Sequence, residues 1–115
     1  MSSRYSRAHE KFSDAVYRLA TGEKDVRDRL RRAYTPLNRL HANELPADLQ
    51  EEWGAILREM TKLGPERWRD EIVDSAINHT MSRIRNSTGR KLAERIYRLN
   101  SELIWLVERQ KKRQQ

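Results

Sequence analysis

The sequence contains no cysteine. This absence excludes disulfide bonds, thiolate metal ligands and a thiol nucleophile, while it leaves the redox compartment undecided. Glycine and proline are also scarce, with 4 and 3 residues in a chain of 115. So few turn-forming residues do not suit the loop-rich sequence of a β-sandwich or β-barrel. The composition therefore favours a helical fold.

Long apolar runs are absent as well. No segment approaches the roughly 18 consecutive apolar residues that a membrane-spanning helix needs. The opening residues, MSSRYSRAHEKF, lack the apolar stretch of a secretory signal. We therefore expect a cytoplasmic protein that makes no membrane contact.

Charged residues are abundant, at 36% of the chain, and they give a net charge of +7 at pH 7. The enrichment in Ala, Leu, Glu, Arg and Lys favours helix throughout. Residues 89–115 contain eight basic and three acidic residues, so this segment alone carries a net charge of +5. A basic protein of this kind is suited to bind nucleic acid or an acidic protein.

Apolar residues recur at helical spacing in five segments, and no segment alternates as a half-buried strand would. We expect helices at about 4–20, 25–40, 46–63, 66–87 and 90–110. The short connections predict that sequence neighbours pack antiparallel. The expected fold class is an all-α, antiparallel bundle of five helices. It forms a single domain over residues 1–110, followed by a basic, frayed tail over residues 111–115.

The boundary between the last two helices is ambiguous. Helical phase continues from Ile84 to Ile96 across Gly89, which would allow one continuous helix and a total of four. However, the residues from Asn86 to Gly89 are a cluster of turn formers. We therefore expect the chain to break at Gly89 and to start a new helix there.

The segment around this break is strongly basic, since residues 82–98 contain six basic residues and one acid, Glu94. A helix starting at Gly89 would offer free N–H groups, with Thr88 as a possible cap and Arg90 and Lys91 beside them. The helix dipole disfavours cations there, which makes a functional reason for them worth considering. We predict a phosphate- or nucleic-acid-binding site made of Arg83, Arg85, Thr88, Arg90, Lys91, Arg95 and Arg98. The alternative is a solvated charged face.

The last helix is apolar on more than one side at the string LIWLV, residues 103–107. A helix at the edge of a small bundle does not need such a pattern, so either this helix is central in the bundle or part of it contacts another chain. An exposed Trp beside Arg is a common interface anchor, and it can also stack on a base. We predict a protein interface made of Tyr97, Ile104, Trp105 and Arg109. The alternative is that Trp105 packs under the amino-terminal helix.

Two acid pairs offer a possible metal site. Glu51-Glu52 and Glu71-x-x-Asp74 resemble the magnesium ligands of the MazG-type nucleotide pyrophosphohydrolases, which are EExxE and then ExxD on successive helices. In this sequence Ala55 stands where the third acid of the first motif belongs. At about 100° per residue, Glu51 and Glu71 also turn away from the apolar stripes of their helices. These acids are therefore expected to diverge and to bind no metal.

Histidine gives no stronger signal for catalysis. The string RYSRAH, Arg4-x4-His9, resembles the Arg-x4-His motif of the HEPN ribonucleases, but here it lies at the amino terminus. None of the three histidines has a second histidine three or four residues away, as a zinc site would require. We expect no catalytic residue, no metal and no cofactor.

The sequence therefore predicts a non-enzymatic, basic helical protein that acts by binding. The leading hypothesis is contact with nucleic-acid backbone through the carboxyl-terminal basic surface, as part of a larger complex. The alternative is a pure protein–protein interaction module, such as an inhibitor, adaptor or immunity-type partner. A homo-oligomer through the last helix is also possible, and an enzyme of the MazG or HEPN kind is the third hypothesis.

Overall fold

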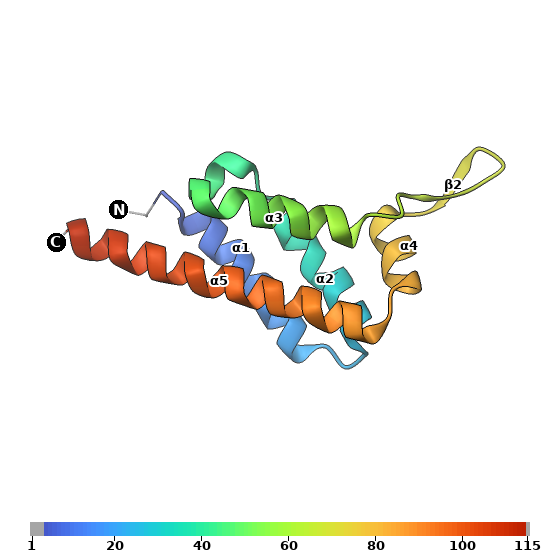
Figure 1. Cartoon of the computed structure of the whole chain (residues 1–115), viewed down its shortest axis with the longest axis horizontal. Coiled ribbons are helices and arrows are strands. Elements are labelled where there is room, and N and C mark those ends of the chain that lie inside the picture. Colours follow the sequence, from blue (N-terminus) through green and yellow to red (C-terminus); the bar gives the residue numbers. More distant parts are fainter. Residues whose placement is uncertain (1–3, 115) are drawn as a thin grey trace.

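The structure, a computed structural model, describes residues 4–114. Over these residues it is mainly helical, with five α-helices, 75% helix and one small two-stranded sheet (Figure 1). The elements in chain order are α1 (Ser6–Thr21), α2 (Val26–Asn38), the 3-10 turn η1 (Ala42–Glu44), α3 (Ala47–Met60), β1 (Glu66–Trp68), β2 (Glu71–Asp74), α4 (Ala76–Arg83) and α5 (Asn86–Gln114). None of the helices among residues 4–114 is long and apolar enough to cross a membrane.

The small sheet is a β-hairpin, and it corrects the expectation of an all-α fold with a helix over 66–87. Strands β1 and β2 pair antiparallel, with Trp68 opposite Glu71. The tip residues Arg69 and Asp70 both have positive φ, at 50° and 70°, as a two-residue type I′ turn requires. Trp68 and the β-branched residues of β2 fit a strand, although their spacing also fits a helix. Only α4 remains of the expected fourth helix.

The turn before the hairpin lies just after residue 63, where the sequence predicts that the third helix ends. Gly64 has a φ of +67°, and Pro65 follows it, so α3 cannot continue. Two neighbouring residues of α4 hold this turn. The backbone N–H of Leu63 donates to Thr80 Oγ1 at 3.2 Å, and His79 Nδ1–H donates to the Gly64 carbonyl at 3.0 Å. The root of the hairpin is therefore fixed to α4.

The break between the last two helices exists, but it lies at Ile84–Arg85 and not at Gly89. Ile84 is extended (φ −75°, ψ 159°) and 8% exposed, so its side chain anchors the turn in the core. Arg27 Nη1 donates to the Ile84 carbonyl at 3.3 Å. The N–H of Gly89 already donates to the carbonyl of Arg85, the residue just before α5, at 3.0 Å. Gly89 is thus a helical residue and starts no new helix.

Gly89 has a packing role instead. A Cβ atom at this position would lie 2.9 Å from Val26 Cγ1 and 3.4 Å from Leu30 Cδ1, both on α2. Real Cβ atoms essentially never approach another heavy atom as closely as 2.9 Å. The missing side chain therefore lets the first turns of α2 and α5 touch.

Helix α5 is the longest element and lies along α1, α2 and α3 (Figure 1). Its buried stripe consists of Leu92, Ile96, Leu99, Leu103 and Val107, each 4% exposed or less. The stripe packs with Phe12 of α1, Leu30 of α2 and Ile56 of α3 in one core. Residues 111–114, expected as part of a frayed tail, continue α5 in the structure.

The two interior helical glycines give a test of the α2–α5 contact. We expect Gly89→Ala to destabilise the protein by about 1 kcal/mol, because overpacking costs roughly 1–3 kcal/mol and the gain in helix propensity offsets about 0.5–1. Gly54→Ala in α3 is the control, since its Cβ would meet only the mobile end of Arg58, with Nη1 at 3.1 Å. It should stabilise by about 0.5–1 kcal/mol. Urea unfolding measures both, and equal stabilisation by the two would contradict the close contact.

Candidate anion-binding surface

The chain from the end of the hairpin to the second turn of α5 has no acidic residue. No Asp or Glu occurs between Asp74 and Glu94, whereas this stretch contains Arg83, Arg85, Arg90 and Lys91. Among residues 4–114, no carboxylate lies within ion-pair distance of the last three of these cations. Arg83 has only a long contact to Glu66, with 3.8 Å between Nη2 and Oε1. The positive charge of this stretch is therefore largely uncompensated.

Part of this charge surrounds a hollow of about 410 Å³ where α3, α4 and α5 meet, which we call the junction hollow. Its lining comes from the turn after α3, from the α4–α5 break and from the first turn of α5. These residues are Lys62, Leu63, Arg83, Ile84, Arg85 and Thr88. Three cationic side chains and one hydroxyl thus line a single hollow.

The first turn of α5 contributes to this hollow in a way that differs from the predicted cap. Thr88 is the third residue of α5, so it does not cap the helix. It is half-buried and lines the hollow with its side chain. The N–H groups of a helix's first turn lack acceptors within the helix and carry the positive end of its dipole. An anion at this position would meet both the cations and this dipole.

The two cations that follow Gly89 point in different directions. At about 100° per residue, Lys91 lies about 60° around the helix axis from Thr88, whereas Arg90 lies about 160° away. Both side chains are exposed. Lys91 can therefore extend the positive flank beside the hollow, whereas Arg90 lies on the opposite side of α5.

Arg95 has a structural role and does not join the other cations. Its guanidinium donates to Glu52 from Nε at 3.1 Å and from Nη2 at 2.7 Å, and Nη1 lies 3.0 Å from Glu59 Oε2. These bonds to Arg95 hold the pKa of the Glu52 carboxyl below its usual value, against a smaller opposite effect of desolvation. Arg95 therefore joins α5 to α3. Arg98, one turn further, is exposed and has only a 3.9 Å contact to Glu94.

The predicted interface residues on the second half of α5 lie on the surface. Tyr97 is 61% exposed, Ile104 38% and Trp105 59%, so Trp105 does not pack under α1. The Arg109 guanidinium lies over the Trp105 ring, 5.1 Å from its centroid. Trp105 also forms one wall of a hollow of about 380 Å³, which we call the Trp105 groove. The groove is lined by Asp48, Leu49, Ser101, Glu102, Trp105 and Leu106.

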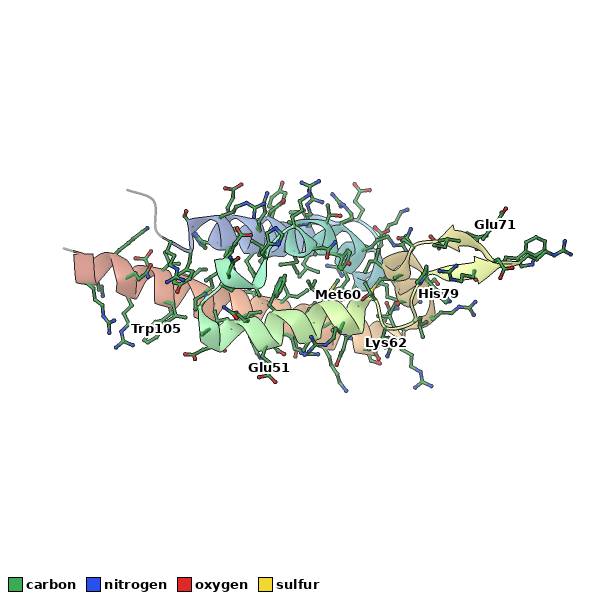
Figure 2. All side chains as sticks on the ribbon, turned by 90° about the horizontal axis from the view of Figure 1, so that it is seen from above. Glu51, Met60, Lys62, Glu71, His79 and Trp105 are labelled. Atoms are coloured by element: carbon green, nitrogen blue, oxygen red, sulfur yellow. The ribbon has the colours of Figure 1, made fainter. Side chains whose placement is uncertain are left out.

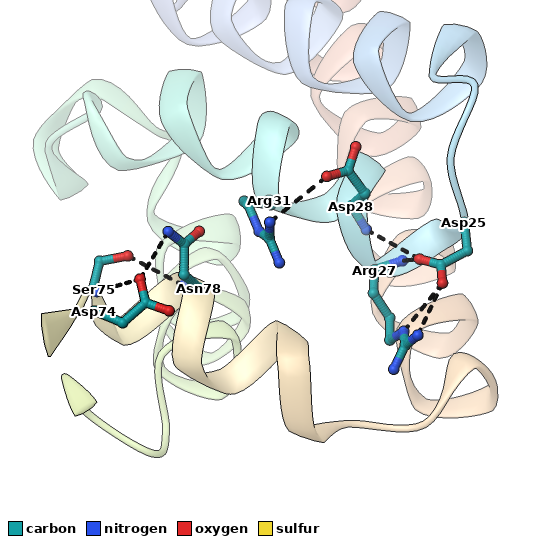
Figure 3. A network of polar contacts seen from close by, with 7 residues as sticks. All are labelled: Asp25, Arg27, Asp28, Arg31, Asp74, Ser75 and Asn78. Atoms are coloured by element: carbon teal, nitrogen blue, oxygen red, sulfur yellow. Dashed lines mark hydrogen bonds and ion pairs between the residues drawn. The ribbon is translucent and has the colours of Figure 1, made fainter. Parts of the chain in front are cut away.

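A second polar cluster lies between the start of α2 and the start of α4 (Figure 3). Asp25 caps α2 by accepting from the N–H groups of Arg27 and Asp28, as its position in the sequence suggests. The Arg27 side chain bonds the same carboxylate, at 3.0 Å, and thereby lowers the pKa of Asp25. Arg31 pairs with Asp28 at 3.7 Å. The positive charges of Arg27 and Arg31 are therefore compensated by Asp25, the cap of α2, and by Asp28 of the same helix.

The acid pairs that resemble the MazG motif do not form its arrangement. Glu51 and Glu52 lie on α3, whereas Glu71 and Asp74 lie on strand β2 and not on a following helix (Figure 2). Glu52 is bound to Arg95. Within residues 4–114, no group of three or more His, Asp or Glu side chains is placed to hold a metal ion.

The Arg-x4-His string lies at the start of α1. His9 is half-buried on this helix, and the Arg4 guanidinium lies over the Tyr5 ring, 5.6 Å from its centroid.

Sequence reasoning missed Lys62 and the hairpin residue Trp68. Lys62 reaches the junction hollow only because the turn after α3 is bonded to α4. Its position two residues before Gly64 gives no sign of this contact. Trp68 lies in the segment where the sequence predicts a helix over 66–87, but it is on strand β1 and 60% exposed.

The Glu52–Arg95 pair predicts a specific pH dependence. Because the Glu52 pKa is lowered in the fold, its stabilising effect is present above the unfolded value of about 4.3 and is lost as pH falls through the folded value. We expect Glu52→Gln to cost about 0.5–1 kcal/mol at pH 7 and nothing at low pH, where the wild-type carboxyl is protonated. Urea unfolding from pH 7 to pH 3 measures this difference.

The neighbouring variant Glu51→Gln is the control. It removes the same charge from an exposed position on α3 that points away from α5 (Figure 2). It should have little effect at any pH. An equal loss in both variants would mean that net charge, and not the contact with Arg95, stabilises the fold.

Comparison with protein-family models, with curated proteins and with solved structures finds no match to this chain. Its function is therefore inferred from its residues and their geometry.

Proposed function

We propose that this chain is a non-enzymatic, basic helical-bundle protein that binds the phosphate backbone of nucleic acid as part of a larger complex. The binding surface is the junction hollow, with Lys62, Arg83 and Arg85, extended along α5 by Lys91 and Arg98. The observation that carries this proposal is the acid-free stretch from residue 75 to 93, of which Arg83 and Arg85 line the junction hollow together with Lys62.

The chemistry of the surface favours phosphate over other anions on a macromolecule. Arginine forms paired hydrogen bonds with phosphate oxygens, and a helix amino terminus adds N–H groups. Backbone contacts of this type position a protein on nucleic acid without reading sequence. We therefore expect binding with little sequence preference.

Such binding should depend steeply on salt. Each phosphate that is neutralised on duplex DNA releases counterions, so log K falls with log salt at a slope of about −0.9 per contact. Four or five contacts from the proposed surface would give a slope of about −4.

The alternative is a protein-interaction module in which the same positive surface docks an acidic protein. The exposed Trp105, with Arg109 over its ring, supports this alternative, because Trp and Arg are the usual anchors of protein interfaces. A nuclease-treated pull-down that recovers a stoichiometric protein complex, from a chain that retains no nucleic acid at low salt, would favour it.

The direct test uses two charge-matched double variants. Arg85→Glu with Lys91→Glu changes the proposed surface, and Arg32→Glu with Arg39→Glu changes exposed cations of α2 and its carboxyl end. Each substitution changes the charge by −2, so both variants have a net charge of +3 in place of +7. Fluorescence anisotropy with labelled DNA and RNA, between about 50 and 200 mM salt, measures affinity and salt slope.

We expect the surface variant to lose at least tenfold in affinity at low salt and to reduce the salt slope by about two. The α2 variant should lose much less, because its cations lie outside the surface. Equal losses in the two variants would indicate attraction by net charge alone. Absence of binding by the wild type at low salt would overturn the proposal.

A further inference from the structure

One face of α5 is exposed along the second half of the helix, which lies at one edge of the molecule (Figure 1). The residues that follow one another on this face, at steps of four and three, are Glu94, Arg98, Ser101, Trp105, Glu108 and Lys112. All six are exposed, and at about 100° per residue they fall within about 80° around the helix axis. Steps of four and three form the seam of a helix pair, so we call these six residues the outer seam.

The outer seam is complementary to itself when two copies of α5 run antiparallel. If Ser101 of one copy is set opposite Trp105 of the other, Glu94 comes opposite Lys112 and Arg98 comes opposite Glu108. Two-fold symmetry repeats each contact, so four pairs of opposite charge flank two Trp–Ser contacts. Only this antiparallel register pairs every charge of the seam. A parallel two-fold pair would instead set each charge opposite its own copy.

The Trp105 groove lies where this register puts the Trp105 ring of the second copy. Ser101 is small, and it lines the groove together with Leu49 and Leu106, which provide an apolar floor. A ring set opposite Ser101 reaches this floor. Trp is a large apolar side chain with one N–H donor, and it is a common anchor of protein interfaces.

The charge of the groove also suits this ring. Asp48 and Glu102 line the groove, and in the described part of the chain neither has a cation within ion-pair distance. The Arg109 guanidinium lies over the Trp105 ring, so the ring brings a cation with it. Glu102 and Arg109 lie on the same flank of the seam, and in an antiparallel two-fold pair the same flanks of both helices meet. The acidic groove therefore receives an aromatic ring that has a cation over it.

The opposite flank of the seam is apolar. Tyr97 and Ile104 lie there, about 80° and 100° around the axis from Trp105 on the side away from Glu102. They are 61% and 38% exposed. The antiparallel pair brings this flank of both copies together, which would cover the exposed apolar side chains.

We propose that this chain forms a two-fold symmetric dimer in which the outer seams of two α5 helices pack antiparallel, with Trp105 of each copy in the Trp105 groove of the other. The pairing does not depend on nucleic-acid binding. Arg98 belongs to both proposed surfaces, whereas Lys91 and the cations of the junction hollow lie outside the outer seam.

The dimer is expected to be of modest strength. The seam is about 27 Å long at 1.5 Å per residue, and with its flanks it uses about ten residues of each α5. A standard interface uses about 20–30 residues on each side. We therefore expect a dissociation constant in the micromolar range, weakened by salt because exposed charge pairs contribute.

The test exchanges the charges of one pair within a single chain. Glu94→Lys sets two lysines opposite each other, and Lys112→Glu sets two acids opposite each other. The double variant Glu94→Lys with Lys112→Glu restores opposite charges between the copies and keeps the net charge of +7. The two residues are 18 positions apart on α5, so they cannot contact each other within one chain. Sedimentation velocity of nuclease-treated protein at low salt, over a range of concentrations, measures the association.

The wild type should approach twice the chain mass of 13.8 kDa as concentration rises. Each single charge variant should weaken the dimer about tenfold, and the double variant should return its affinity to within about threefold of the wild type. Trp105→Ala should remain a monomer, because it removes the ring and keeps a good helix former. Circular dichroism should show the same helix content in all of these variants.

Two exposed positions on α1 provide matched controls. Glu10→Lys makes the same charge change as Glu94→Lys, and the Glu10 side chain is 75% exposed. Tyr17→Ala removes an aromatic side chain that is 66% exposed, as Trp105→Ala does on α5. Both control variants should associate like the wild type.

Three results would refute the dimer. The wild type could remain a monomer at the highest concentration, or its association could survive Trp105→Ala. The double charge variant could also associate as weakly as the single variants, which would exclude the antiparallel register. None of these results bears on the junction hollow, and the Arg85→Glu with Lys91→Glu variant should form the dimer whether or not it binds nucleic acid.

Discussion

The burial of one apolar stripe on α5 is the constraint on which the rest of the fold depends. Leu92, Ile96, Leu99, Leu103 and Val107 form a wall that α1, α2 and α3 share. Burial of a side chain of this size contributes about 1.5–3 kcal/mol, so the stripe is a major part of the stability of a small domain. At one end of the stripe, α5 approaches α2 closely. Gly89 allows this approach because its missing side chain leaves room for Val26.

The charges of α5 follow from this arrangement and divide the helix into three parts. Its first two turns carry Arg90 and Lys91, which have no carboxylate of residues 4–114 within ion-pair distance, since Glu66 of the hairpin reaches only Arg83 at the end of α4. In its middle, Arg95 is held by two acids of α3. Toward its end, Trp105 and Arg109 are exposed, and Trp105 lines a groove together with Asp48 and Leu49 of α3. Helix α5 thus contributes buried side chains to the core, an ion pair to α3 and exposed side chains to the surface.

The sequence predicts the first three helices well, because each has a local stop or cap, such as Asp25 and Gly64. It fails at the hairpin, since Trp68 and Ile72 fit both periodicities and the Arg69-Asp70 tip lacks the usual Asn-Gly signal. In the sequence Gly89 resembles a turn residue, because none of its sequence neighbours indicates that it packs against Val26. The ion pair of Arg95 could likewise not be predicted from the sequence, since its partner Glu52 lies 43 residues away.

The turn after α3 has a consequence of its own. Lys62 and Leu63 line the junction hollow, and the same turn, through Leu63 and Gly64, bonds to α4 and holds the root of the hairpin. The junction hollow and the position of the hairpin are therefore linked through one turn. A ligand that shifts this turn in the hollow would also shift the root of the hairpin.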